Sequence, residues 1–458
     1  MDLALVPPLH RSLRPETQPD PLRDRLAGHI EQSVLSALDP ARIEALAQDM
    51  GAMERQRTHH AGLLVCALIL SAFERSTDTE GRLLDARKTY EMLGGPASGK
   101  TSFRKKVHNL VPVMDELLKR QLHTLAEVSQ DREMGGRLRD FADIIIPDGC
   151  AFKLAQCLSG IYAGTGTASE LKLHAVYSVK ADGCIQVTST AGAVHDSDGF
   201  WPASWVKDAL YLWDLGYQNN SRFIDAALAG AHVLQRLKSD ANPIVLASYG
   251  PTGHRRELAM DDGAPARLSD ACEFQLVHRR DVLDLDAMLS DKERSILVRI
   301  VCVPHQGEDR YYLTTLPRDV FSAHDIAELY RLRWEVELLF RDWKGAMRLD
   351  EVRRLSHPLS LRAVVTASLL AAVMARDIHR RLEQLVHEHA RLSSNSDASA
   401  PFPPSASASA FGRRVLPNAQ RFEPLSARSA GSEPDRLRPQ PSARARLSYS
   451  HSARSRRL

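Results

Sequence analysis

Two short apolar runs, each ending in an acid and a glycine, constrain the fold of this chain more than any other feature. The first is FADIIIPDGCAF at residues 141–152, and the second is LYLWDLGY at residues 210–217. A buried strand that ends in this way exposes a carboxylate at the rim of a sheet while its own residues stay in the core. Strand-like and helix-like segments alternate around both runs, which predicts an α/β core with Asp148 and Asp214 at its rim.

The segments around these runs have the periodicity of further strands and helices. LKLHAVYSVK (171–180) and CIQVTSTAGAV (184–194) alternate like strands, with the turn ADG between them. A helix is expected around residues 198–210, and residues 322–390 have helical spacing. Neither acid defines a site alone, since Asp-Gly after a strand is most often only a turn.

Charge is distributed unevenly along the chain. Residues 391–458 contain 12 Arg, no Lys and 4 acids, which is a net charge of +8. Because the net charge of the whole chain is +3, the remaining residues carry a net charge of −5. With 15 Ser and 8 Pro, this tail is expected to be disordered, and its composition also suits an out-of-frame extension. Local clusters must therefore make any case for nucleic-acid binding. Arg104, Lys105 and Lys106 form one, as a phosphate contact or simply a solvated helix start.

Several protein classes do not fit the composition. The six cysteines include no C-x-x-C pair, so they predict neither a zinc framework nor a disulfide scaffold. The longest apolar runs, at 61–73 and 363–375, are 13 residues each and predict buried core helices rather than membrane spans. Proline and acid stand where a secretory signal needs a basic start and an apolar run. We expect a cytoplasmic protein without a membrane partner.

LGGPASGKTSF, at residues 93–103, matches the phosphate-binding loop of ATPases from Gly94 to Thr101. Such a loop directly follows a strand, whereas the residues before Gly94 have helical spacing and its two glycines are a normal helix stop. We expect a link between two helices, with Thr101 or Ser102 as the cap of the second. An ATPase remains an alternative, because the two apolar runs could supply its acidic magnesium strand.

A charged and aromatic segment, YRLRWEVELLFRDWK at 330–344, contains a third acid. In one continuous helix, at about 100° per residue, four of its side chains fall within an arc of about 60°. They are Tyr330, Arg333, Glu337 and Lys344. Periodicity alone is equally satisfied by a solvated helix face. Two cations and an aromatic ring around one carboxylate also suit a phosphodiester bound beside a metal ion. Glu335 is expected to point away, at the surface.

The spacing Tyr-x2-Arg-x3-Glu-x6-Lys resembles the YREK signature of bacterial insertion-sequence transposases of the DDE class, the group that cuts DNA through hairpins. All four positions match. PDGCAFKL, LKLHAVYSV, DLGY and RYYLTTLP are similar to further stretches of the family. LLDARKTYEMLGG and TSFRKKVHNLVPVMDELLK resemble its end-binding region. The resemblance extends over about residues 30–390.

The resemblance implies a ribonuclease-H-like catalytic core. Asp148 lies on its first strand, Asp214 on its fourth and Glu337 on a late helix, with a β-rich insertion between the last two acids. The expected divisions are a disordered leader at 1–25, a helical DNA end-binding domain at 26–135, the first part of the core at 136–239, the insertion at 240–316, the core helix and helical C-terminal part at 317–390, and the disordered tail at 391–458.

The resemblance also implies a chemistry. Asp148, Asp214 and Glu337 are expected to be the catalytic metal ligands, since hard oxygen donors without Cys or His favour Mg²⁺ or Mn²⁺ in two-metal phosphoryl transfer. The enzyme then nicks an element end, forms and opens a hairpin, and joins the end to target DNA. Its partners are double-stranded DNA and a second copy in a synaptic homodimer, in the bacterial nucleoid. Tyr330, Arg333 and Lys344 hold the terminal phosphates and a flipped base.

Some alternatives and residues stay open at this point. A resolvase-like or repair nuclease on the same fold, or a catalytically silent DNA-binding relic, also accounts for the pattern. In the family an aromatic side chain of the insertion stacks on the flipped base, and Tyr311 or Tyr312 is the candidate here. His195 and Asp196, after the third strand, are a loop pair or a substrate contact. His174 is most simply a core or surface histidine.

Overall fold

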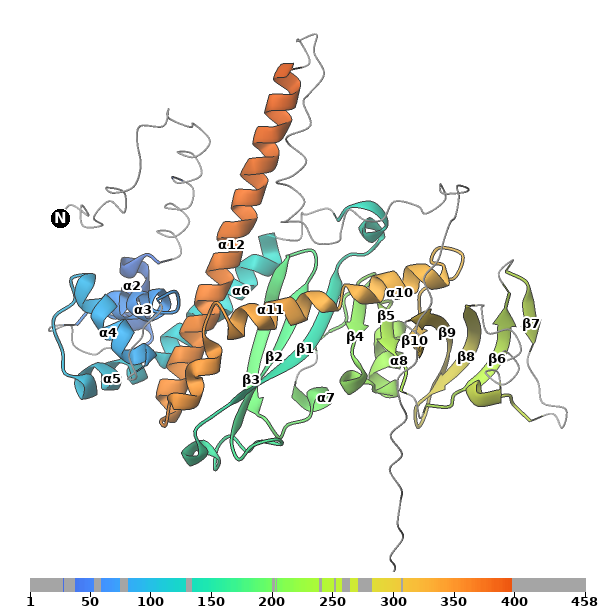
Figure 1. Ribbon diagram of the computed structural model, residues 1–458, viewed down its shortest axis with the longest axis horizontal. Coiled ribbons are helices and arrows are strands. Elements are labelled where there is room, and N and C mark those ends of the chain that lie inside the picture. Colours follow the sequence, from blue (N-terminus) through green and yellow to red (C-terminus); the bar gives the residue numbers. More distant parts are fainter. Residues whose placement is uncertain are drawn as a thin grey trace, which may run out of the picture. The chain divides into compact units, whose positions relative to one another are not determined.

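The computed structural model describes most of the chain up to residue 397 (Figure 1). The described residues are 28, 38–52, 59–74, 81–128, 134–199, 202, 204–238, 241–250, 253–257, 264–270, 282–305 and 308–397. The chain divides into two compact units, 1–402 and 403–458, and all described residues belong to the first. The leader expected at 1–25, and the expected tail after residue 397, lie outside the described residues.

Helices make up the described part of the N-terminal region. They are α2 (Pro40–Asp49), α3 (Ala61–Leu70), α4 (Arg82–Met92), α5 (Lys100–Asn109) and α6 (Val111–Val128). The carboxylate of Asp39 accepts the backbone N–H groups of Ala41 and Arg42 and so caps the start of α2. Helix α3 is apolar and almost wholly buried, as its sequence predicts. Gly62 permits this packing, because a Cβ there would overlap the carbonyl oxygen of Pro40.

Residues 93–103 link two helices, as expected, but the predicted cap is wrong. Helix α4 ends at Met92, Gly94 has a φ of 89°, and α5 begins at Lys100. Gly99 is the N-cap of α5, and neither Thr101 nor Ser102 makes a capping bond, because both already lie inside the helix. The segment before Gly94 is a helix, so the strand–loop–helix setting of a phosphate-binding loop is missing here.

One sheet of ten strands runs through the rest of the described chain, in the order β3-β2-β1-β4-β5-β10-β9-β8-β6-β7 (Figure 1). The strands are β1 (Ile144–Lys153), β2 (Glu170–Ser178), β3 (Gly183–Ala191), β4 (Leu210–Trp213), β5 (His232–Arg236), β6 (Ile244–Tyr249), β7 (Arg255–Glu257), β8 (Leu283–Ser290), β9 (Ser295–His305) and β10 (Glu308–Thr314). Strands β1 to β3 form an antiparallel meander, and β1, β4 and β5 are parallel. This half of the sheet has the ribonuclease-H-like arrangement that the sequence predicts.

The β-rich segment between β5 and the late helices extends the same sheet. Strand β10 pairs antiparallel with β5 on one side and with β9 on the other, and β8, β6 and β7 follow. Leu283, Leu285 and Ala287 alternate inward along β8, which explains why this segment forms strands. The insertion therefore shares a continuous backbone ladder with the core.

Helices α10 (Ala323–Arg331), α11 (Trp334–Lys344) and α12 (Pro358–Asp397) complete the unit, with the shorter α7 (Asp196–Gly199) and α8 (Asn220–Leu228) between strands. Helix α11 packs on β1 and β2, and α12 packs on α3, α5 and α6. Arg82 of α4 donates to the carbonyl oxygen of Met347 and to Ser368 Oγ, at 3.0 and 2.7 Å. These contacts connect the helical head to the core.

Two expectations about helices are wrong. No helix spans 198–210 within the described residues, because α7 stops at Gly199 and residues 204–209 are loop and turn. Trp205 packs instead on Tyr211 and Trp213, with ring centroids 5.0 and 5.9 Å apart. The boundary expected at 391 falls within α12, which continues to Asp397.

Helix α12 contains the longest apolar segment. By length and composition, Pro358–Val386 could cross a membrane, with a mean hydropathy of 1.7 in its most apolar window, but 72% of that window is buried inside the structure. That burial is typical of a core helix, which is what residues 363–375 predict.

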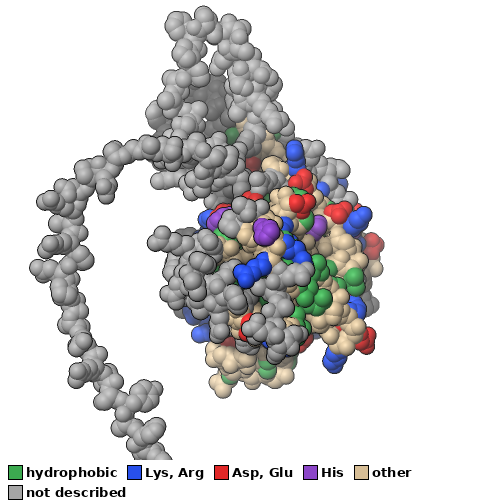
Figure 2. Space-filling model, turned by 90° about the vertical axis from the view of Figure 1, so that its right-hand side faces the viewer, with side chains coloured by type: hydrophobic (Ala, Val, Ile, Leu, Met, Phe, Trp, Pro, Cys, Tyr) green, Lys and Arg blue, Asp and Glu red, His purple; other side chains and the backbone are tan. Residues whose placement is uncertain are grey.

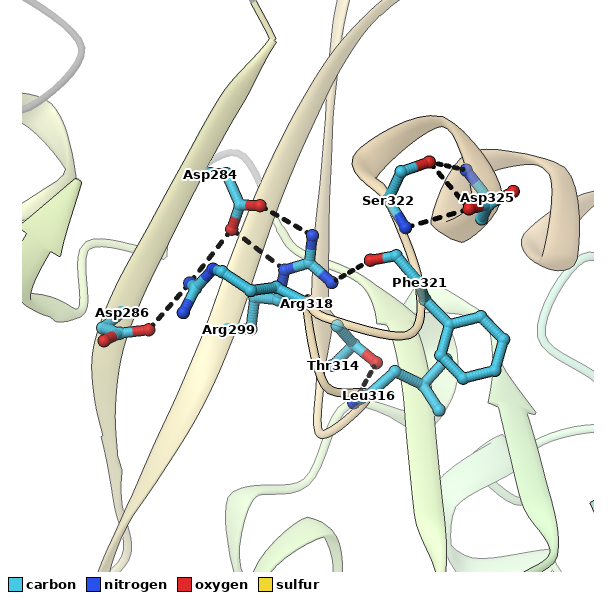
Figure 3. Close-up of polar contacts among 9 residues, drawn as sticks. All are labelled: Asp284, Asp286, Arg299, Thr314, Leu316, Arg318, Phe321, Ser322 and Asp325. Carbon is cyan, nitrogen blue, oxygen red and sulfur yellow. Dashed lines mark hydrogen bonds and ion pairs between the residues drawn. The ribbon is translucent and has the colours of Figure 1, made fainter. Parts of the chain in front are cut away.

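A buried ion pair connects the insertion to the loop before α10 (Figure 3). Arg299 of β9 donates two hydrogen bonds to Asp284 of β8, at 2.9 and 2.6 Å, and a third to the carbonyl oxygen of Phe321, at 2.7 Å. A capping box between Ser322 and Asp325 then begins α10. The insertion thereby fixes where α10 starts.

A second arginine shares the same acid (Figure 3). Arg318 lies 3.1 Å from Asp284 and 2.8 Å from Asp286. Its guanidinium carbon is 3.4 Å from the ring centroid of Tyr249, whose hydroxyl donates to Asp286 at 2.8 Å. Asp284 thus neutralises two cations, one of which is only 5% exposed.

We predict that Asp284→Ala lowers the free energy of unfolding by about 3–5 kcal/mol, because it leaves Arg299 as an uncompensated buried cation. Chemical denaturation measures the change. The double variant Asp284→Leu/Arg299→Met should recover most of the loss, since a well-packed apolar pair often replaces a buried ion pair at little cost. Glu293→Ala, at an exposed acid, is the control. A loss equal to that of the control would contradict the prediction.

Candidate active site

Three carboxylates from three separate elements converge on the guanidinium of Arg333. Arg333 Nη1 lies 3.4 Å from Asp148 Oδ2, and Nε lies 4.0 Å from Asp214 Oδ1. Nη2 is hydrogen-bonded to Glu337. The side chains of Arg333 and Asp148 are 17% and 18% exposed, whereas those of Asp214 and Glu337 are 41% and 32% exposed. The structure thus brings together the three acids that the sequence singles out.

The strand register accounts for the position of the two aspartates. Strands β1 and β4 are parallel, with Ile144 opposite Leu210 and Ile145 opposite Tyr211. Continued three residues further, this register places Asp148 beside Asp214. The expectation that Asp148 ends its strand is wrong, because β1 continues through Gly149 to Lys153 while paired with β2. Asp148 reaches the rim because its other neighbour, β4, ends at Trp213.

The segment 330–344 is two helices rather than the single helix expected. Helix α10 ends at Arg331 and α11 begins at Trp334, and the backbone N–H groups of Leu332 and Arg333 bond three residues back, at 3.1 Å. In such a tight turn, residues three apart are eclipsed. Arg333 therefore lies along Tyr330, with its guanidinium 6.0 Å from the ring centroid. The arginine still shares a face with Glu337, four residues on.

Tyr330 supports the site from inside the fold. Its hydroxyl donates to the carbonyl oxygen of Trp213 at 3.2 Å and lies 3.4 Å from Asp214 Oδ1. The side chain is 8% exposed, and its ring centroid is 5.1 Å from that of Tyr312, itself 4% exposed. Tyr312 is therefore packed in the core, and Tyr311 is half-buried beside it. Tyr330 is placed to hold Asp214 rather than to present its ring.

Lys344, the last residue of α11, lies next to β1 but apart from the three acids. Its Nζ is 5.7 Å from the ring centroid of Phe152, and it hydrogen-bonds to Cys150. Burial raises the pKa of the Cys150 thiol, which opposes ionisation there. Within the described residues, Lys344 shares no ion pair with a carboxylate.

Burial and like charge make Asp148 a weak acid. The pKa of Asp148 is raised to about 6, mainly by burial and to a smaller extent by the nearby carboxylates of Asp214 and Asp196, while the N–H of Gly149 and the charge of Arg333 act in the opposite direction. Burial opposes the charge on Arg333, but the bond to Glu337 and the neighbouring acids raise its pKa above the ordinary value. Arg333 therefore stays charged, and its charge favours the ionised form of Asp148.

The donor chemistry of the site fits a divalent ion. Asp148, Asp214 and Glu337 offer hard carboxylate oxygens, the ligands that Mg²⁺ and Mn²⁺ prefer. Among the residues that the structure describes, no three acid, His or Cys side chains are close enough to hold an ion as they stand. The guanidinium of Arg333 lies between the three acids, so an ion would take the place that this cation now holds.

The predicted basic cluster of the head lies on α5. Arg104 and Lys105 are exposed and Lys106 is half-buried, where burial lowers its pKa. Among the described residues, none of the three is bonded to the carboxylates around Arg333. Figure 2 views the molecule from the side of β6 to β8, where described basic side chains are interspersed with acids. A continuous basic surface is therefore not visible on that face.

The structure changes the expected position of two acids. Glu335 is half-buried rather than at the surface, and burial raises its pKa near Asp182 and Arg376. Asp196 lies against Gly149 and Gly216, beside the two candidate catalytic aspartates. Sequence reasoning treated Asp196 only as a loop residue or substrate contact. The signal for its position is the pair of glycines that follow those aspartates.

Comparison with known proteins identifies the class. Residues 151–374 match the family model of the transposase DDE domain, a range that begins just after Asp148 and contains Asp214 and Glu337. The transposase of insertion sequence IS421 from Escherichia coli is 44% identical over 66 residues, which are 14% of this chain and 18% of that protein. The chain thus spans only 18% of the length of that relative.

Longer matches are more distant. The transposase of IS1151 from Clostridium perfringens is 17% identical over 71% of this chain and 75% of its own. That of IS231B from Bacillus thuringiensis subsp. berliner is 20% identical over 68% and 72%. A solved piggyBac transposase synaptic complex with hairpin DNA aligns over 78% of this chain and 79% of its own, at 10% identity and a TM-score of 0.35, too low to establish a common fold.

The matched domain is that of DDE transposases, a class that cuts DNA and transfers its strands with the help of divalent metal ions. Residues 151–374 therefore form a DDE domain similar to that of transposases, and the longer relatives are transposases of bacterial insertion sequences.

We predict that Arg333→Met raises the pKa of Asp148 above its value of about 6, because the variant removes the cation that favours the ionised carboxyl. Titration of the ¹³C-labelled carboxyl signal, assigned by its loss in Asp148→Asn, measures the shift. Arg331→Met is the matched control, since Arg331 is 68% exposed and pairs with Glu328. An unchanged or lower pKa in Arg333→Met would show that Arg333 does not stabilise the cluster.

Proposed function

We propose that this chain cuts double-stranded DNA at the ends of an insertion sequence and joins those ends to target DNA. The observation that carries the proposal is the convergence of Asp148, Asp214 and Glu337 on one guanidinium at the rim of a ribonuclease-H-like sheet. A structural ion-pair network would not need three acids around one cation where a strand ends. The family match and the insertion-sequence relatives support the same activity.

In this proposal Asp148, Asp214 and Glu337 would hold Mg²⁺ or Mn²⁺. When bound, the ions supply activation of the attacking water or 3′-hydroxyl and stabilisation of the leaving oxygen. The poor solvation of Asp148 favours exchange of one cation for another over leaving the carboxylate bare.

The basic side chains would bind the DNA backbone. Arg333 presents a planar fork that suits two oxygens of one phosphate, and its location between the acids puts that phosphate at the reacting centre. Lys344 lies at the far end of α11, beside β1, where it would hold a neighbouring phosphate. Tyr330 keeps Asp214 in place through its hydroxyl. The spacing of these residues with Glu337 also leads us to propose a hairpin intermediate and a flipped base.

The remaining parts of the proposal concern partners. The exposed Arg104 and Lys105 on α5, with Lys106 next to them, would contact phosphates of the element's inverted repeats. Joining requires two ends in one complex, so we propose a homodimer that acts on DNA in the bacterial nucleoid. A catalytically silent relic is the second candidate, and a nuclease that cuts without joining is the third.

We predict that the full chain, with Mg²⁺ and a duplex that contains the inverted repeat, gives hairpin products on a denaturing gel. Asp148→Asn, Asp214→Asn and Glu337→Gln should each lower the cleavage rate by about 10²–10³-fold or more, the scale of losing one group that stabilises transition-state charge. Glu328→Gln, on the exposed side of α10, should cut normally. Binding without cleavage would favour the catalytically silent relic. Cutting without joining would favour a nuclease, and ATP-dependent turnover would favour an ATPase.

We predict that Arg333→Ala and Lys344→Ala each slow cleavage about 10- to 100-fold, as expected for one charged hydrogen bond to phosphate. Single-turnover cleavage of bound DNA measures the step. Arg331→Ala, which removes an equal charge from the outer face of α10, is the control. If both variants cut and join as the wild type does, neither side chain holds a reacting phosphate.

A further inference from the structure

A fourth acid lies against the backbone of both candidate catalytic aspartates. Asp196 begins α7, directly after β3, and its side chain is 32% exposed. A Cβ at Gly149 would lie 2.5 Å from Asp196 Oδ1, so a larger residue at this position would have to displace the carboxylate. A Cβ at Gly216 would touch Oδ2, at 3.5 Å. Gly149 follows Asp148 directly, and Gly216 is two residues after Asp214.

The carboxylate of Asp196 is held in this position from the neighbouring strand. Lys172 Nζ on β2 lies 3.2 Å from Asp196 Oδ1 and also donates to the carbonyl oxygen of Val194 at 3.0 Å. The Lys172 side chain is only 16% exposed. Residues two apart on a strand share a face, and His174 lies next along β2. Lys172 therefore fixes both the loop after β3 and the acid that begins α7.

His174 is a buried neighbour of the ion pair between Lys172 and Asp196. Its side chain is fully buried, and Nε2 is hydrogen-bonded to Thr190 Oγ1 at 2.9 Å. Its Nδ1 makes no hydrogen bond within the described residues and faces Asp196 Oδ1 at 4.0 Å. The Asp196 carboxylate is thus enclosed by a cation, a buried ring and the Gly149 backbone. An acid that is merely exposed to solvent on a loop would not need to be enclosed in this way.

Asp214 needs support on this side. It follows the last residue of β4 and is 41% exposed, so the sheet does not hold it. Tyr330 contacts it from the core side at 3.4 Å, and Asp196 Oδ2 lies 3.5 Å from where a Cβ at Gly216, two residues later, would be. Asp148, by contrast, lies within a strand paired on the β2 side. Asp196 therefore lies beside the chain segments that follow both aspartates.

We propose that Asp196 is a positioning residue, whose carboxylate, held by Lys172, sets the spacing between the backbones of Asp148 and Asp214 and so the affinity of that pair for a divalent ion. The inference rests on the proposed function of the two aspartates as metal ligands. A surface ion pair alone would contribute little and leave metal binding unchanged. Loss of a residue that orients metal ligands costs about 10–100-fold in affinity.

The test is titration of the full-length protein with Mn²⁺, with the free ion followed by its electron paramagnetic resonance signal. Asp196→Asn removes the charge that Lys172 holds and should weaken Mn²⁺ binding about 10–100-fold. Lys172→Met, a second route to the same loss, should have the same effect. Both should cut DNA with a raised Mn²⁺ requirement and recover at high Mn²⁺. Asp198→Asn, at an exposed acid of the same short helix, should bind as wild type does.

A double variant separates positioning from a general structural effect. Gly149→Ala should displace the Asp196 carboxylate and weaken Mn²⁺ binding, whereas Gly149→Ala/Asp196→Ala should be no worse than Asp196→Ala alone, because the overlap is gone. Additive losses would overturn the proposal. If Asp196→Asn and Lys172→Met both bind Mn²⁺ as the wild type does, while Asp148→Asn loses affinity, the positioning role of Asp196 is overturned and the proposed function is not. Wild-type affinity in Asp148→Asn would instead overturn the proposed function.

Discussion

Acids cannot share a poorly solvated sheet edge in their ionised form unless a cation lies among them, and this requirement governs the centre of the molecule. Arg333 meets it by contacting Asp148, Asp214 and Glu337 at once. In the proposed function, the metal ion and the DNA phosphate would both change the contacts of Arg333. The ion replaces the guanidinium at the acids, and the phosphate offers it new acceptors.

Each distance within this cluster has a separate structural origin. The parallel register of β1 and β4 sets Asp148 beside Asp214, and the early end of β4 leaves both at the rim. The tight turn between α10 and α11 directs Arg333 along Tyr330 and toward the acids. The insertion determines where α10 begins, through the bonds of Arg299 to Asp284 and Phe321. A segment far from the acids in sequence thus contributes to their geometry.

The sequence predicts the core strands, because alternation and short apolar runs are local signals. The meeting of the three acids is instead what the resemblance to DDE transposases implies. The sequence does not predict the break at Leu332 and Arg333, since both residues favour helix. The helix expected at 198–210 fails because Trp205 packs on Tyr211 and Trp213, a tertiary contact. The position of Asp196 is not predictable for the same reason, since its neighbours come from other strands.

The contacts of α12 have a consequence for any DNA bound by the head. Helix α12 packs on α3, α5 and α6. Arg82 of α4 donates a hydrogen bond to the carbonyl oxygen of Met347, which follows α11. Basic residues on α5 and the acids around Arg333 therefore belong to one compact unit, in which described helices of the head pack on described helices of the C-terminal part. In the proposed function, a duplex bound at α5 would be held by helices that pack on α12, and this packing would help to set the number of base pairs between the bound repeat and the cut.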